Sequence, residues 1–151
     1  MTNPAITEPE RKRWMSLLAK APPLRLQMLL DGLGDHPDHS WLRVPETGGV
    51  MVQGRMGGTG APFNLGEMTV TRCALRIDSG EVGHGYVQGR DRDHAGRAAL
   101  VDALMQTPRA DEIEAQILGP LASEATSRAQ DRAAHAAATK VEFFTMARGE
   151  D

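Results

Sequence analysis

Strand-like segments follow one another closely between residues 41 and 90, and their short connections limit the fold more than any other feature of this sequence. Residues 68–77 alternate polar and apolar side chains, as a half-buried strand does. Parallel neighbours need crossovers of roughly a dozen residues or more, and the connections here are too short for them. We therefore predict an antiparallel meander of about four strands, formed by residues 41–45, 49–53, 68–77 and 82–88.

Two turn signals join these predicted strands. Glu46-Thr47-Gly48 is typical of a hairpin turn between the first two strands, and Asp78-Ser79-Gly80-Glu81 of a turn between the last two. On the strand at residues 68–77, Arg72 and Arg76 share one face with two small apolar residues. The opposite face carries Cys73, which we expect to be a small buried residue rather than a nucleophile.

Two helices are predicted before the sheet. Thr7 has the features of an N-cap for residues 8–20, because Glu10 follows it three residues later. Pro22-Pro23 interrupts the helical pattern, which resumes over residues 24–33.

Further helices are predicted after the sheet. Asp91 or Asp93 is expected to cap a helix that ends near Gln106, and Gly119-Pro120 is expected to stop a second, short helix. The last helix is rich in alanine and runs from residue 123 to residue 140. The chain is thus predicted to be a single α+β domain over residues 1–151, with N-terminal helices at 1–34, the sheet at 41–90, helices at 91–140 and a docking tail at 141–151.

Composition excludes several classes of protein. A net charge of −3 argues against a general binder of nucleic acids or anionic membranes, and aromatic residues, at 4%, are too few for base-stacking platforms. The single cysteine, Cys73, excludes an intramolecular disulfide and any cysteine-rich metal site. No apolar run reaches membrane-spanning length and the N-terminus lacks a signal core, so we expect a cytoplasmic protein.

A glycine-rich segment between two predicted strands is the first candidate site. It contains Arg55, Gly57, Gly58, Thr59 and Gly60. Glycines leave backbone N–H groups accessible, and a nearby arginine suits a phosphate. No Lys-Ser or Lys-Thr follows, so the segment is not a P-loop. The other interpretation is a connecting loop that needs positive φ angles.

The arginines form a second candidate site. Arg72 and Arg76 lie on one strand face, and Arg90 and Arg92 follow the last strand. Arginine is well suited to phosphate and phosphonate oxygens. The other interpretation is a solvated sheet face, on which Arg90-Asp91-Arg92-Asp93 pair among themselves.

A third cluster combines histidines with an aspartate. Asp91 and His94 have helical i,i+3 spacing and His84 precedes them on a strand, so the three residues suit a metal or an acid–base pair. The spacing matches no established zinc or iron motif, and we predict no metal in this chain. The alternative is that His94 is a first-turn helix residue with a hydrogen bond to Asp91.

Six segments together resemble a known family, in order and with compatible spacing. They are residues 11–18, 55–60, 62–72, 83–91, 99–106 and 141–149. These segments are similar to those of the PhnG family, the small subunit of the bacterial carbon–phosphorus lyase complex. The resemblance covers most of the chain, apart from the loop near His36 and residues 107–138.

The resemblance implies a role within a complex. PhnG-type chains belong to a cytoplasmic complex with PhnH-, PhnI- and PhnJ-type subunits. With PhnH-, PhnI- and ATPase-like PhnL-type subunits, they support the reaction of MgATP with methylphosphonate to give alpha-D-ribose 1-methylphosphonate 5-triphosphate and adenine. The chain would then be one subunit of a multi-protein transferase, inactive alone. It would bind no cofactor itself, since MgATP is a substrate of the complex. No catalytic residue is carried over from the family.

Three interpretations of the candidate residues remain. In the first, the chain helps to hold anionic substrate at a subunit boundary through Arg55, Gly57, Gly58, Thr59, Gly60, Arg72, Gln88 and Arg90. In the second, it is purely structural and all chemistry belongs to its partners. The C-terminal Phe143, Phe144 and Met146 are predicted to dock onto a partner in either case. A free-standing metal enzyme that uses His84, Asp91 and His94 is the third and least favoured interpretation.

Overall fold

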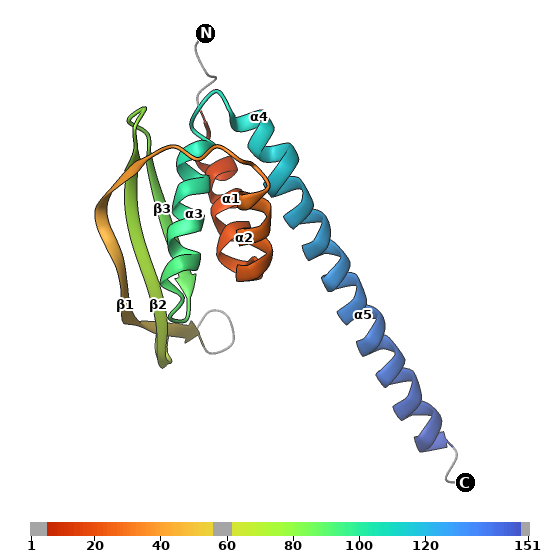
Figure 1. Ribbon diagram of the computed structural model, residues 1–151. Coiled ribbons are helices and arrows are strands. Elements are labelled where there is room, and N and C mark those ends of the chain that lie inside the picture. The colour runs from red at the N-terminus through yellow and green to blue at the C-terminus, as the bar shows by residue number, and fades with distance from the viewer. Residues whose placement is uncertain (1–5, 56–61, 149–151) are drawn as a thin grey trace.

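The computed structural model describes residues 6–55 and 62–148 and confirms an α+β fold (Figure 1). One antiparallel sheet is covered on a single side by helices, and the last helix extends far beyond them. In chain order the elements are α1 (Glu8–Lys20), α2 (Pro23–Asp31), β1 (His39–Arg55), β2 (Pro62–Ile77), β3 (Val82–Gln88), α3 (Arg92–Leu104), α4 (Ala110–Ile113), the π-helical segment η2 (Glu114–Leu118) and α5 (Gly119–Arg148).

The described part of the chain forms three strands, in the order β1-β2-β3, so the prediction of about four strands was wrong. The error lies at Glu46-Thr47-Gly48, which continues β1 instead of turning. Glu46 pairs with Arg72 and Gly48 with Val70, and the Thr47 and Thr71 hydroxyl oxygens are 3.0 Å apart. Pairing with the long strand β2 outweighs the local turn preference. The second predicted turn is confirmed, with Gly80 at a φ of 104°.

One face of the sheet packs closely against α3. A Cβ atom at Gly83 would lie 1.8 Å from the Ala99 carbonyl oxygen, and one at Gly85 would lie 2.0 Å from that of Ala95. Only glycine therefore allows the helix and β3 to approach this closely. Cys73, Leu75 and several α3 residues are buried in the core between them.

The predicted helix starts are confirmed at α1 and α3. Thr7 and Glu10 form a capping box, in which each side chain bonds to the other residue's backbone N–H. Asp91, rather than Asp93, caps α3 by accepting from the His94 N–H at 2.9 Å.

The predicted helix stop at Gly119-Pro120 was wrong. The Gly119 N–H bonds to the Glu114 carbonyl across a π-helical turn, and α5 continues through Pro120 for 30 residues. In a regular α-helix the proline ring would meet the carbonyl of Gln116, four residues earlier, whereas a wider π turn gives it room. Residues 126–141 are exposed at every position, because α5 leaves the body of the molecule (Figure 1). Over the described residues, no helix combines the length and the apolar character needed to cross a lipid bilayer.

Candidate functional site

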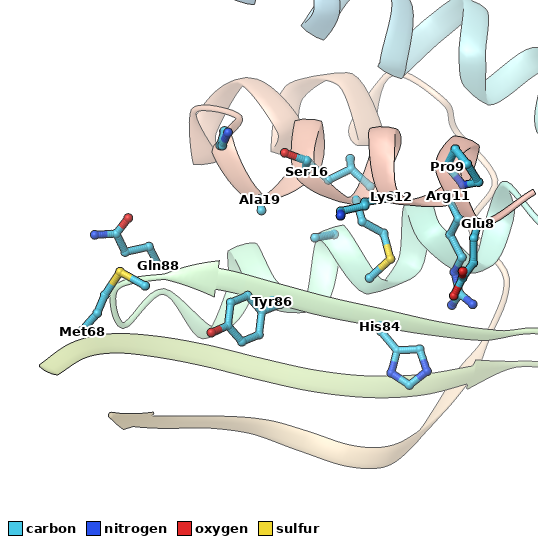
Figure 2. Close-up of a pocket in the computed structure, with 14 residues that line it drawn as sticks. Glu8, Pro9, Arg11, Lys12, Ser16, Ala19, Met68, His84, Tyr86 and Gln88 are labelled. Atoms are coloured by element: carbon cyan, nitrogen blue, oxygen red, sulfur yellow. The ribbon is translucent and has the colours of Figure 1, made fainter. Parts of the chain in front are cut away.

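A groove of about 1240 Å³ lies between α1 and β3. Figure 2 shows Lys12, Ser16 and Ala19 on the helix side of this groove. His84, Tyr86 and Gln88 line the opposite side, on β3. Because β3 is the last strand of the sheet, its outer backbone edge faces the groove rather than another strand. The predicted substrate-binding residue Gln88 therefore lines this groove.

A buried carboxylate closes one end of this groove. Asp102 is fully buried and accepts from Arg11 Nη2 at 2.9 Å, from Trp14 Nε1 at 2.8 Å and from the backbone N–H of His84 at 2.8 Å. Arg11 Nε adds a fourth bond at 3.2 Å. The hydrogen bond to this carboxylate raises the pKa of Arg11 above its ordinary value. One side chain of α3 thus holds α1 and β3 at a fixed separation.

The sheet face opposite the helices carries the predicted arginines. The strand register places Arg72 between Glu46 on β1 and Tyr86 on β3. Arg72 and Arg76 are exposed, and no helix covers this face (Figure 1). Glu46 instead pairs with Arg43, at 3.3 Å between Nε and Oε2. The arrangement leaves exposed guanidinium groups that suit an anionic ligand or surface.

The remaining predicted residues spread along the sheet. Gln88 pairs with Val70, two positions along β2 from Arg72, so Gln88 and Arg72 share the open face. Arg90 is exposed just beyond the end of β3. Arg55 pairs with Pro62, ten positions along β2 from Arg72. Gly57, Gly58, Thr59 and Gly60 lie outside the described residues.

The structure separates the three residues proposed as metal ligands. His94 is buried, and its Nε2 donates to the Leu18 carbonyl oxygen at 2.9 Å, whereas His84 is exposed at the groove. Asp91 is occupied as the N-cap of α3. Within residues 6–55 and 62–148, no group of three histidine, cysteine or acidic residues is arranged to hold a metal. His94 is thus a first-turn residue of α3 whose backbone N–H bonds to Asp91, as the structural alternative predicted. Its ring also fastens α3 to α1, which was not predicted.

Cys73 is buried, as predicted. Burial raises the pKa of its thiol to about 11, so the thiolate is scarce at neutral pH. Cys73 is a core residue and not a nucleophile.

Comparison with known proteins identifies the family. The family described as "Phosphonate metabolism protein PhnG" matches residues 9–149. The chain belongs to the PhnG family. It is also 43% identical over 146 residues to "Alpha-D-ribose 1-methylphosphonate 5-triphosphate synthase subunit PhnG" of Rhizobium meliloti (strain 1021), a match that covers 94% of this chain and 91% of that protein.

The PhnG family match covers the glycine-rich segment and the C-terminal tail as far as residue 149. The backbone of Phe143, Phe144 and Met146 continues α5, so this part of the tail is helical. Docking by these three side chains stays a prediction.

Sequence reasoning missed Asp102 and the groove beside it. The available signal was a single acidic residue on the apolar side of a helix, since Asp102 follows Ala95 and Ala98 at helical spacing.

Proposed function

We propose that this chain is a subunit of alpha-D-ribose 1-methylphosphonate 5-triphosphate synthase and acts in the breakdown of organophosphonates. The observation that carries the proposal is the 43% identity to a subunit of that name over nearly the whole of both chains. In this proposal the chain works in the cytoplasm as part of a transferase that joins methylphosphonate to the ribose of MgATP with release of adenine. It is inactive alone.

The shape of the chain supports a role in assembly. α5 leaves the helical layer and exposes every residue from 126 to 141 (Figure 1). Its side chains there are mostly small, polar or charged, so the helix buries little apolar area within its own chain. We assign α5 as the element that docks onto partners of the PhnH, PhnI, PhnJ or PhnL type.

The assembly role is tested by deleting residues 142–151, the end of α5 that carries Phe143, Phe144 and Met146. The truncated chain should fold with an unchanged core, because every residue whose side chain the structure describes as buried precedes residue 122. It should no longer co-purify with the other subunits when they are expressed together. Full retention in the complex would contradict docking through this segment.

The open sheet face supports a second, narrower role in holding substrate. Neither Arg72 nor Arg76 forms an ion pair with a described residue, and both are exposed on a face that carries no helix. Triphosphate and phosphonate groups are anions that a fixed guanidinium can orient and stabilise. We propose that Arg72 and Gln88, with Arg55, Arg90 and the loop amides of residues 57–60, contact substrate at a boundary with the catalytic partner.

The substrate role is tested by Arg72→Ala in the reassembled complex, with adenine release as the readout. We expect a raised KM for ATP or methylphosphonate. Arg72→Lys keeps the charge but loses the bidentate geometry, so its KM should lie between those of Arg72→Ala and the wild type. Intact assembly with unchanged kinetics would remove Arg72 from the site and favour the purely structural subunit.

A further inference from the structure

We propose that the groove between α1 and β3 binds a short extended segment of a partner subunit, which pairs with the edge of β3 and directs acidic side chains toward Lys12 and Lys20. The inference rests on the proposed function, because the partner is taken from the same complex. Beyond the proposed function, the inference names the site where the partner binds, the backbone geometry of the contact and the charge of the bound segment.

Two backbone groups on the outer edge of β3 already bond to side chains of their own chain. The His84 N–H donates to Asp102 Oδ2 at 2.8 Å, and the Val82 carbonyl accepts from Gln106 Nε2 at 2.7 Å. These two side chains stand where the backbone of a neighbouring strand would stand. They show that the backbone groups of residues 82 and 84 point out of the sheet and toward the helices.

The next outward position on this edge is Tyr86. Backbone direction alternates with a period of two, so the N–H and C=O groups of Tyr86 point the same way as those of His84. No strand of the described residues pairs there, because β3 has β2 as its single neighbour. An unpaired edge that opens into a groove is the geometry used for strand addition by a peptide.

The wall opposite this edge is apolar and wide. Met15, Leu18 and Ala19 of α1 line it, together with Ala98 of α3, whereas Met68 lines the sheet side of the groove beside Gln88 (Figure 2). The volume of about 1240 Å³ exceeds the range of roughly 300–1,000 Å³ that is usual for small-molecule sites. An extended segment would place alternate side chains against this wall while its backbone pairs with β3.

Charge on α1 defines the chemistry of the segment. On other sides of the helical layer, Arg13 pairs with Glu114 and Arg25 with Glu124. Lys12 and Lys20, which line the groove, form no ion pair with any residue in the described ranges. Eight helical residues span about 12 Å, and four extended residues span about 13 Å. The bound segment should therefore carry acidic residues four positions apart.

A second copy of the chain fits the groove less well. Two copies paired through β3 would bring Lys12 and Lys20 of each chain together, and like charges at such a boundary disfavour association. We therefore assign the groove to a different polypeptide.

The test compares two substitutions at Tyr86 in binding to the purified remainder of the complex. Tyr86→Pro removes the N–H that points out of the sheet, and proline is tolerated on an edge strand in this orientation. Tyr86→Ala loses the same side chain but keeps the N–H. Tyr86→Pro should bind roughly tenfold more weakly than Tyr86→Ala, while circular dichroism shows both to be folded.

A second variant does not depend on the strand. Lys12→Glu combined with Lys20→Glu changes two exposed side chains and should also weaken binding roughly tenfold, with a strong dependence on salt. Arg13→Glu, a charge reversal at an exposed position of α1 that does not line the groove, is the matched control and should bind as the wild type does.

The outcomes separate this proposal from the proposed function. If the wild-type chain binds none of the purified subunits, both proposals fail. If the wild type binds and neither the proline nor the double glutamate variant binds more weakly, the groove proposal alone fails. It also fails if these variants change ATP affinity in place of assembly, or if they abolish a dimer of this chain.

Discussion

Replacing Asp102 by asparagine is expected to lower the free energy of unfolding by about 3 kcal/mol. Asparagine keeps the size of the side chain and one accepting oxygen, so Trp14 Nε1 and Arg11 Nε still find a partner. Its amide group, however, faces two donors that now sit at 2.9 and 2.8 Å from Oδ2, namely Arg11 Nη2 and the His84 N–H. Both donors lose their acceptor, and the side chain at position 102 that would have to satisfy them is fully buried.

The size of this effect follows from the exposure of the partners. Removing one member of a buried ion pair costs about 3–5 kcal/mol. The lower end applies because the Arg11 side chain is 35% exposed and regains water when the bond is lost. For a chain of this length, about 3 kcal/mol corresponds to a fall in melting temperature of about 6–12 °C.

The assay is urea denaturation followed by circular dichroism, with the m-value compared between variants. Asp131→Asn, an exposed position on α5, is the control and should change stability by less than about 0.5 kcal/mol. If Asp102→Asn also stayed within about 0.5 kcal/mol of the wild type at equal m-value, the carboxylate would not be the clamp between α1, α3 and β3.

Two further predictions concern the core. Gly85→Ala should destabilise the chain by about 2 kcal/mol, because the new Cβ would lie 2.0 Å from the Ala95 carbonyl oxygen, while Gly48→Ala meets nothing within 4 Å and should be nearly neutral in the same melting experiment. Cys73 should react with a thiol reagent at pH 8 only as fast as the chain unfolds. Because its folded pKa is raised to about 11, stability is unaffected below pH 8 and falls as the pH rises from about 9 to about 11. Cys73→Ala should flatten that decline, and an equally steep decline in this variant would assign the loss to other groups.

The features predicted correctly from the sequence are those that depend on neighbours along the chain. The capping box of Thr7 and Glu10 and the N-cap at Asp91 each involve residues three positions apart. Alternation along residues 68–77 likewise identified the buried face that holds Cys73. These signals need no knowledge of the tertiary structure.

The incorrect predictions fall where the surrounding structure overrides the local preference of a short segment. Glu46-Thr47-Gly48 has turn chemistry, yet the partner strand β2 lies about 24 residues further along the chain and holds these residues extended. Gly119-Pro120 has the chemistry of a helix stop, yet the π-helical turn before it carries the helix onward. Local preference alone did not reveal either outcome.

The groove could not be predicted from the sequence, because the residues that form it lie far apart along the chain. Asp102 draws its partners from Arg11, 91 residues away, and from His84, 18 residues away, so no local rule connects them. Once these contacts are known, the cations of α1 fall into two groups. Arg11 and Arg13 are paired with acidic residues of their own chain, whereas Lys12 and Lys20 line the groove and have no such partner within the described ranges. Exposed lysines are hydrated, so the isolated fold is stable without a partner. The unpaired edge of β3 beside them can nevertheless accept a second polypeptide that supplies backbone groups and carboxylates.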